Sequence, residues 1–121
     1  MLDNINGKKI YLVGICGTAM ASLAGLLKEK GALVYGSDKR FYPPMGDFLN
    51  EMGATLFAGY KKEHISAEYD FYVIGNAIPR GNEELEEILN QGYAYFSMVD
   101  ILKYFFLNRT ENIVITGTHG K

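Results

Sequence analysis

The groups in this sequence best placed to do chemistry belong to a glycine turn near the N-terminus. The turn consists of Gly14, Ile15, Cys16, Gly17, Thr18 and Ala19. An apolar run typical of a buried strand precedes it, and apolar residues at helical spacing follow it. The first N–H groups of a helix lack partners within the helix and lie at the positive end of its dipole, so they can bind an anion. The turn therefore predicts a phosphate-bearing ligand, although an ordinary strand-to-helix connection could carry similar glycines.

The turn departs from the dinucleotide fingerprint G-x-G-x-x-G at two positions. Counted from Gly14, the second glycine position holds Cys16 and the third holds Ala19. Alanine is accepted at the third position, because that residue only has to let helix and strand pack closely. A cysteine at the second position crowds the approach of a pyrophosphate. Cys16 itself has two interpretations: a thiol made reactive by the helix N-terminus, or a small half-buried filler, which we favour.

Two further loops supply polar side chains after predicted strands. Asp38 ends the second apolar run, where dinucleotide folds use an acidic residue to bond a ribose hydroxyl; the alternative is an aspartate that only caps a loop. The fourth apolar run leads into Gly75–Asn82, in which Asn76 offers a donor and an acceptor. Arg80 in the same loop can bind a phosphate or carboxylate with two N–H groups. Ligands of open α/β sheets bind at this edge.

Strands and helices alternate along the chain in a way that would bring these loops together. The predicted strands span residues 10–13, 32–37, 54–58, 70–74 and 93–96. The predicted helices begin at Thr18, at Pro44, at Glu83 behind an Asn82 N-cap, and behind a Ser97 N-cap. This alternation predicts an α/β fold, a three-layer Rossmann-like domain with a parallel sheet of about five strands.

The composition excludes several classes of protein. Hydrophobic residues make up 48% and charged residues 21%, which is ordinary for a folded globular chain. The net charge of −2 and the lack of a basic run argue against nucleic acid or a membrane as a partner. No apolar stretch approaches the ~20 residues of a membrane span, and the single cysteine fits a reducing compartment, so we expect a cytoplasmic protein. His64 has no ligand-type residue at metal spacing, so we predict no metal site and interpret it as a surface or partly packed histidine.

The C-terminal segment contains a second phosphate motif. A predicted strand, Asn112–Thr116, leads into Gly117, Thr118, His119, Gly120 and Lys121. A Gly-x-x-Gly-Lys sequence after a buried strand is typical of the start of an ATP-binding loop, here without the Ser or Thr that would hold magnesium. We therefore expect residues 1–108 to form a Rossmann-like domain that binds a phosphate-bearing ligand. Residues 109–121 would be a linker, a strand and the start of the ATP-binding loop of a missing central domain.

Taken together, these motifs resemble the Mur ligases of bacterial cell-wall synthesis. The resemblance rests on Gly14–Met20, Tyr42–Met45, Gly75–Ala77, Arg80–Asn82 and Gly117–Lys121, and it covers essentially the whole chain. Within the family, these residues look most like the branch that adds a whole tripeptide, ahead of the branch that adds L-alanine. The resemblance implies that residues 1–108 are the UDP-sugar-binding domain of a three-domain ligase that uses ATP and Mg²⁺. Such a ligase joins an amino acid or tripeptide acceptor to the lactyl carboxylate of UDP-N-acetylmuramate through an acyl phosphate.

The same resemblance implies roles for individual residues. The Gly14–Ala19 turn would receive the diphosphate, Asp38 would lie toward the uridine ribose, and Asn76 and Ala77 would border the nucleotide. Lys121 would reach the β- and γ-phosphates of ATP. No catalytic residue and no bound cofactor is expected in this fragment, which would bind UDP-N-acetylmuramate without ligating it. Two alternatives stay open: an NAD(P)-binding Rossmann domain of an oxidoreductase, and a non-enzymatic nucleotide-binding module.

Overall fold

The chain forms one parallel sheet of five strands in the order β3-β2-β1-β4-β5. The computed structural model describes residues 4–107. The strands are β1 (Lys9–Val13), β2 (Leu33–Asp38), β3 (Thr55–Ala58), β4 (Phe71–Ile74) and β5 (Tyr95–Ser97). All four pairings between neighbouring strands are parallel. The predicted α/β fold with about five parallel strands is confirmed.

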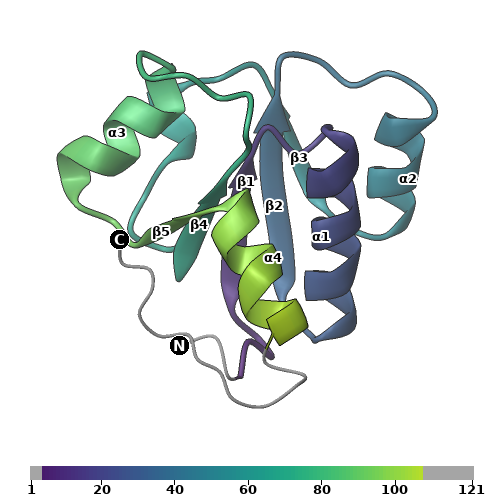
Figure 1. The fold of residues 1–121 in the computed structure, drawn as a ribbon. Coiled ribbons are helices and arrows are strands. Elements are labelled where there is room, and N and C mark those ends of the chain that lie inside the picture. Colours follow the sequence, from purple (N-terminus) through teal and green to yellow (C-terminus); the bar gives the residue numbers. More distant parts are fainter. Residues whose placement is uncertain (1–3, 108–121) are drawn as a thin grey trace.

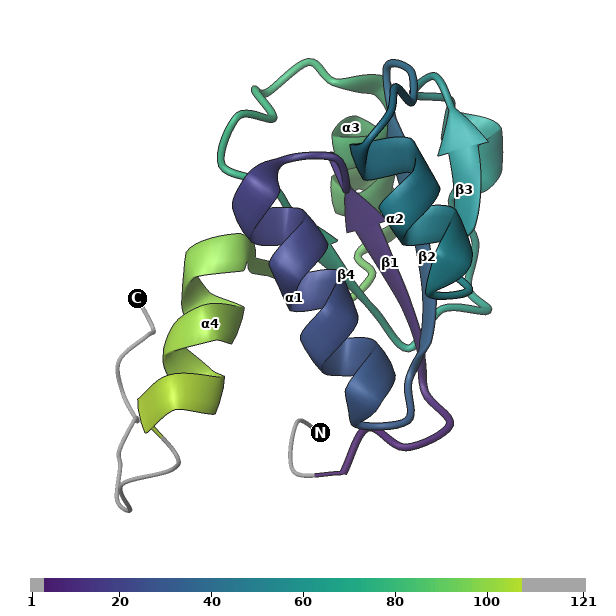
Figure 2. The ribbon, with the colours of Figure 1, turned by 90° about the vertical axis from the view of Figure 1, so that its right-hand side faces the viewer.

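Helices cover both faces of this sheet, which makes the three predicted layers (Figures 1 and 2). One face carries α1 (Thr18–Glu29), α2 (Met45–Glu51) and α4 (Met98–Leu107). The opposite face carries α3 (Glu83–Gln91) and the 3₁₀ turn η1 (Lys62–His64). In the strand order β1 is the middle strand of the sheet, so it lies between the two layers of helices.

The central strand β1 separates two hydrophobic cores. Ile10 and Leu12 point toward the core beneath α1 and α4, while Tyr11 and Val13 point toward the core beneath α3. All four side chains are fully buried. A strand buried on both faces needs apolar residues at successive positions, which explains the continuous apolar run in the sequence.

The helix boundaries follow local chemistry that was predicted from the sequence. The Asn82 side chain accepts hydrogen bonds from the N–H groups of Glu84 and Leu85, at 2.9 and 3.1 Å, and so caps α3. Gly92 ends the same helix in the left-handed conformation, with φ of 73°. The Ser97 hydroxyl accepts the N–H of Asp100 at the start of α4. These caps are confirmed.

A few boundaries differ from the prediction. β5 begins at Tyr95 rather than at residue 93, and the Tyr93 ring stacks on Tyr72 in the connection from α3. β2 runs on to include Asp38, and η1 lies in the connection from β3 to β4. The predicted strand over residues 112–116, the ATP-loop residues and the domain boundary after residue 108 lie outside the described residues. Within residues 4–107, no helix is long and apolar enough to cross a membrane.

Candidate functional site

A cleft of about 1050 Å³ lies at the carboxyl edge of the sheet, where β1, β2 and β4 end side by side. Three loops form it: the glycine turn after β1, the end of β2, and the loop after β4. The lining residues predicted from the sequence are Gly14, Cys16, Gly17, Thr18, Ala19, Asp38, Asn76, Ala77 and Arg80. Segments far apart in the sequence therefore meet at one place, as expected for the ligand edge of an open α/β sheet.

The first half of the glycine turn is tied to β2. The N–H groups of Gly14 and Ile15 both donate to the Ser37 carbonyl oxygen, each at 2.9 Å. The N–H of Cys16 donates to a carboxylate oxygen of Asp38 at 3.0 Å. Gly14 has φ of +86°, and a Cβ there would lie 3.1 Å from the Ile78 side chain. These three N–H groups already have partners within the protein.

The second half of the turn leaves the N-terminus of α1 open. Gly17 is the N-cap residue, and no side chain caps the helix. The N–H groups of Thr18 and Ala19 belong to the first turn of α1, and both residues line the cleft. Because the first N–H groups of a helix have no intrahelical acceptor, this is the part of the turn that can bind an anion.

Asp38 lies between the turn and the loop after β3. Besides the Cys16 N–H, its carboxylate accepts the N–H of Lys39 at 2.8 Å and the hydroxyl of Tyr60 at 3.3 Å. Burial first, and the charge of Asp38 second, raise the pKa of the Tyr60 hydroxyl, which therefore stays protonated and donates. Asp38 thus holds two walls of the cleft together.

The thiol of Cys16 is not activated by its position. Burial first, and the nearby Asp38 carboxylate second, raise its pKa to about 11. A raised pKa leaves little thiolate near neutral pH, which counts against the hypothesis of a reactive thiol at this site. The partly buried side chain, whose sulfur lies 3.9 Å from the Arg40 carbonyl oxygen, agrees with the filler interpretation.

The loop after β4 brings Asn76, Ala77 and Arg80 to the opposite wall. The Arg80 guanidinium donates to both carboxylate oxygens of Glu86, at 2.8 and 3.1 Å, and the Gly81 N–H donates to the same carboxylate at 2.7 Å. The Arg80 hydrogen bond is the main reason why the pKa of Glu86 falls to about 2. The expected bidentate contact therefore exists, but it joins Arg80 of the loop to Glu86 of the following helix, α3.

Ile15 does not belong to the cleft, which corrects the prediction from the sequence. Its side chain is fully buried in the core and lies directly over Gly36 of β2. A Cβ at Gly36 would lie 2.6 Å from the Ile15 Cδ1 atom and 2.9 Å from the Leu12 carbonyl oxygen. The alternation that buries Ile15 could not be read from a turn sequence, because the chain changes direction there.

Several lining residues were not predicted. They include Met20, Lys39, Tyr60, Ile78, Pro79 and Met98. Lys39 could have been predicted because it directly follows Asp38 in the sequence, whereas Tyr60 reaches the cleft only because β3 lies next to β2.

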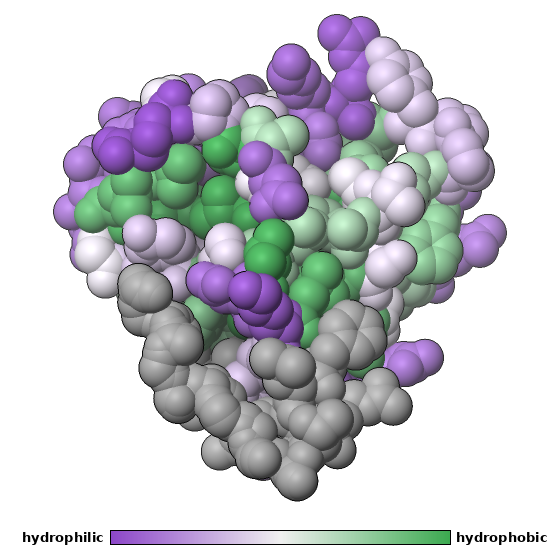
Figure 3. Space-filling model, viewed as in Figure 1, coloured by the Kyte–Doolittle hydropathy of each residue, from purple (hydrophilic) through white to green (hydrophobic). Residues whose placement is uncertain are grey.

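The surface between α3 and α4 is largely apolar and bordered by hydrophilic side chains (Figure 3). A smaller hollow of about 360 Å³ continues the cleft there and shares Asn76, Ile78 and Arg80 with it.

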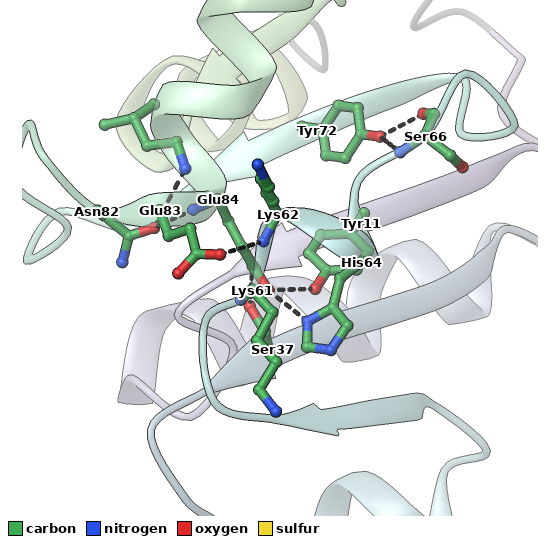
Figure 4. A network of polar contacts seen from close by, with 11 residues as sticks. Tyr11, Ser37, Lys61, Lys62, His64, Ser66, Tyr72, Asn82, Glu83 and Glu84 are labelled. Carbon is green, nitrogen blue, oxygen red and sulfur yellow. Dashed lines mark hydrogen bonds and ion pairs between the residues drawn. The ribbon is translucent and has the colours of Figure 1, made fainter.

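A buried polar network, also missed, lies beneath the cleft (Figure 4). Its centre is Glu84, which is fully buried. The carboxylate accepts hydrogen bonds from the Tyr11 hydroxyl, the Ser37 hydroxyl and the Lys61 N–H. The Nδ1 atom of His64 lies 2.6 Å from the same carboxylate. The prediction of a partly packed histidine is thus confirmed, and among residues 4–107 no group of three potential ligands could hold a metal ion.

A protein-family model matches most of the chain. Residues 9–110 match the model described as "Mur ligase family, catalytic domain". The chain belongs to the Mur ligase family. The matched range contains every residue that lines the cleft.

Two groups of curated Mur ligases are similar in sequence. UDP-N-acetylmuramate--L-alanyl-gamma-D-glutamyl-meso-2,6-diaminoheptandioate ligase of Escherichia coli is 39% identical over 113 residues, which are 93% of this chain and 25% of that protein. UDP-N-acetylmuramate--L-alanine ligase of Clostridium acetobutylicum is 37% identical over 120 residues, which are 99% of this chain and 26% of that protein. The chain spans about a quarter of the length of these relatives. The predicted resemblance is confirmed, with the peptide ligases ahead of the L-alanine ligases.

Solved structures of Mur ligases contain the same fold. The UDP-N-acetylmuramate:L-alanyl-gamma-D-glutamyl-meso-diaminopimelate ligase from Neisseria meningitides has a TM-score of 0.79 and 38% identity, and the match covers 84% of this chain and 32% of that one. The murein peptide ligase from Psychrobacter arcticus has a TM-score of 0.76 and 41% identity, over 80% of this chain and 20% of that one. Shikimate dehydrogenase from Aquifex aeolicus, at 12% identity and a TM-score of 0.57, shares the fold alone; that match covers 91% of this chain and 49% of that one.

Proposed function

We propose that this chain is the UDP-N-acetylmuramate-binding domain of an ATP-dependent amide-forming ligase. The observation that carries the proposal is the uncapped N-terminus of α1, which opens into a cleft assembled from three loops. The relatives that share this part of the chain are named as ligases of UDP-N-acetylmuramate. A nucleoside diphosphate has an anionic centre that suits a helix N-terminus.

The hydrogen bonds of the glycine turn suggest where each part of the ligand would bind. The diphosphate would bind to the N–H groups of Thr18 and Ala19, since those of Gly14, Ile15 and Cys16 already have acceptors. Lys39 lines the same cleft, and its ammonium would add a cationic partner. Asp38 would accept a ribose hydroxyl, and Asn76 and Ala77 would border the nucleotide.

The reaction of the whole ligase would proceed in two steps. A lactyl carboxylate oxygen attacks the γ-phosphorus of ATP, and ADP leaves. The amine of an amino acid or tripeptide acceptor then attacks the acyl carbon, and inorganic phosphate leaves as the amide forms. ATP and Mg²⁺ would supply the phosphoryl group and its charge neutralisation. The assignment of Gly117, Thr118, His119, Gly120 and Lys121 to ATP rests on the sequence motif and the family, because these residues lie outside the described ones.

The domain division proposed here is a UDP-sugar domain over residues 1–108 and the start of an ATP-binding domain over residues 109–121. By itself this chain would bind the UDP-sugar and form no amide. We place the ligase in the cytoplasm, in peptidoglycan synthesis or recycling, with a tripeptide acceptor favoured over L-alanine. The sequence identity to the Escherichia coli peptide ligase, 39% against 37% for the Clostridium acetobutylicum L-alanine ligase, supports that order.

An NAD(P)-dependent oxidoreductase is the main competing function, because the fold is shared with shikimate dehydrogenase. Separate calorimetric titrations of the chain with UDP-N-acetylmuramate, NAD⁺ and ATP discriminate between the two. We expect the UDP-sugar to bind more tightly than NAD⁺, with no tight ATP site. Tighter binding of NAD⁺ would overturn the ligase assignment. Binding of UDP-N-acetylmuramate by a full-length protein that forms no amide with any acceptor would favour a non-enzymatic nucleotide-binding module.

A further inference from the structure

We propose that Glu84 is a positioning residue of the nucleotide cleft. Through Ser37 it sets the position of the glycine turn, and through Lys61 it sets the position of the neighbouring Tyr60, which lines the cleft. The proposal deepens the proposed function and rests on it for the identity of the ligand. Glu84 does not line the cleft, and its side chain is fully buried beneath it. It therefore acts through the residues that it binds.

The first connection runs through Ser37. The Ser37 hydroxyl donates to Glu84 Oε1 at 2.5 Å, and the Ser37 carbonyl oxygen accepts the N–H groups of Gly14 and Ile15. Ser37 is fully buried, so water cannot replace either contact. The next residue, Asp38, accepts the Cys16 N–H. The glycine turn is thus attached to two successive residues of β2, the first of which is fixed by Glu84.

The second connection runs through the segment after β3. The Lys61 N–H donates to Glu84 Oε2 at 3.1 Å, and His64 approaches the same oxygen. Tyr60, next to Lys61, lines the cleft and donates to Asp38. The His64 ring also stacks on Phe57 of β3, at 4.7 Å between ring centroids. One carboxylate therefore holds this segment against the end of β2 (Figure 4).

The strength of this attachment follows from burial. A buried carboxylate is tolerated only if hydrogen bonds replace its lost hydration, and each donor that it holds is then expensive to release. Burial, followed by the charge of Glu84, raises the pKa of the Tyr11 hydroxyl, so the tyrosine remains a donor. Donors from β1, β2 and the segment after β3 meet at this single group, and none of the described buried polar side-chain atoms lacks a partner.

The test compares the chain with its Glu84→Gln variant by amide NMR and by calorimetry with UDP-N-acetylmuramate. Glutamine keeps the shape but has one acceptor oxygen where the carboxylate has two. We expect the amide signals of Gly14, Ile15, Cys16 and Lys61 to shift and to exchange faster with solvent. Binding of UDP-N-acetylmuramate should weaken about tenfold, or about 1.4 kcal/mol.

Two controls separate positioning from a loss of stability. Glu83→Gln changes the neighbouring exposed carboxylate, which binds the Lys62 N–H. Ile88→Val removes a methylene from a fully buried residue of the same helix that has no part in the network. Both should leave the amide signals of the glycine turn and the affinity unchanged, although Ile88→Val lowers the stability of the fold.

Unshifted turn amides in a folded Glu84→Gln variant would overturn the proposal, as would equal shifts in the Ile88→Val variant. If Glu84→Gln does not fold, Ser37→Ala removes only the Ser37 hydroxyl contact and should produce smaller shifts of Gly14 and Ile15. Unmoved Gly14 and Ile15 amides in that variant also count against the proposal. A wild-type chain that binds no UDP-N-acetylmuramate contradicts the proposed function, while the amide shifts still decide whether Glu84 positions the turn.

Discussion

The N–H of Cys16 donates to a carboxylate oxygen of Asp38 over 3.0 Å, although 22 residues separate the two in the chain. This contact closes the glycine turn against the end of β2 and places a negative charge beside the Cys16 thiol. Because the Cys16 N–H is already bonded, an anion at this turn would bind the N–H groups of Thr18 and Ala19 at the start of α1.

Replacing Asp38 by Asn should make Cys16 more reactive. The Asp38 charge contributes to raising the Cys16 pKa to about 11, and burial contributes more, so the variant's pKa should fall part of the way toward the ordinary value of 9. At a fixed pH of about 8, a thiol-labelling reagent should therefore react several-fold faster. Asp47→Asn, in the first turn of α2, is the matched control and should not change the rate. An unchanged rate in Asp38→Asn would show that burial alone protects the thiol.

Replacing Gly17 by Leu should abolish binding of the UDP-sugar without unfolding the chain. Gly17 has φ of −59°, and a Cβ there would meet its nearest neighbours at 3.8 and 3.9 Å, which is ordinary contact. The longer side chain would occupy the approach to the helix N-terminus, so calorimetry should show a loss of at least tenfold, or about 1.4 kcal/mol.

Gly25→Ala serves as the control for Gly17→Leu, because Gly25 lies in the middle of the same helix. A Cβ there would lie 4.0 Å from the Phe48 ring, with no clash. It should stabilise the fold by up to ~1 kcal/mol through helix propensity and leave binding unchanged. Normal binding by a folded Gly17→Leu variant would contradict the role given to the turn.

The Arg80–Glu86 contact should persist far into the acid range. The folded-state pKa of Glu86 is about 2, below its ordinary value of 4.5. A group with a lowered folded pKa stabilises the fold above its unfolded value and loses that contribution as the pH falls. The stabilisation should therefore be complete above pH 4.5 and lost between pH 4.5 and 2.

Carboxyl ¹³C NMR measures this directly as the titration midpoint of Glu86. The Arg80→Gln variant should move that midpoint upward toward 4.5, since the Arg80 hydrogen bond is the largest cause of the shift. Glu87→Gln, which changes the carboxylate that contacts the Gln91 amide in the same helix, is the matched control and should leave the Glu86 midpoint unchanged. A wild-type midpoint near 4.5 would mean that the contact does not form in solution.

Replacing Gly36 by Ala should destabilise the domain by about 1–3 kcal/mol, the usual cost of overpacking. The new Cβ would lie 2.8 Å from the Ile15 Cβ atom and 2.9 Å from the Leu12 carbonyl oxygen, and neither can move without shifting backbone. Urea unfolding monitored by circular dichroism gives the change. A stability equal to that of the wild type would show that β2 can move away from the turn.

Most of the fold could be predicted because its signals are local. Apolar runs, the Asn82 cap and Gly92 each depend on residues only a few positions away. The presence of a core on each face of the sheet could also be predicted, since a continuous apolar run such as β4 indicates a strand covered on both faces.

The network beneath the cleft could not be predicted, because its contacts span long distances in the chain. Tyr11 and Glu84 are 73 residues apart, and Ser37 and Glu84 are 47 apart. Glu84 is one of four glutamates among residues 83–87 of α3, a composition that normally indicates a solvated helix face. Only the arrangement of the strands reveals that this one carboxylate points inward.

The order of the strands has a consequence for how the domain is made. Of the five strands that the structure describes, β1 is synthesised first, yet it is the central one, and it pairs with β2 on one side and with β4 on the other. While the ribosome extends the chain, β1–β2–β3 can assemble early, but the second edge of β1 stays open until Phe71–Ile74 emerges. At about 5–20 residues per second, the unpaired N–H and C=O groups of that edge and the apolar side chains of β1 remain accessible for about a second or more, long enough for a chaperone to bind the strand or for another nascent chain to pair with it.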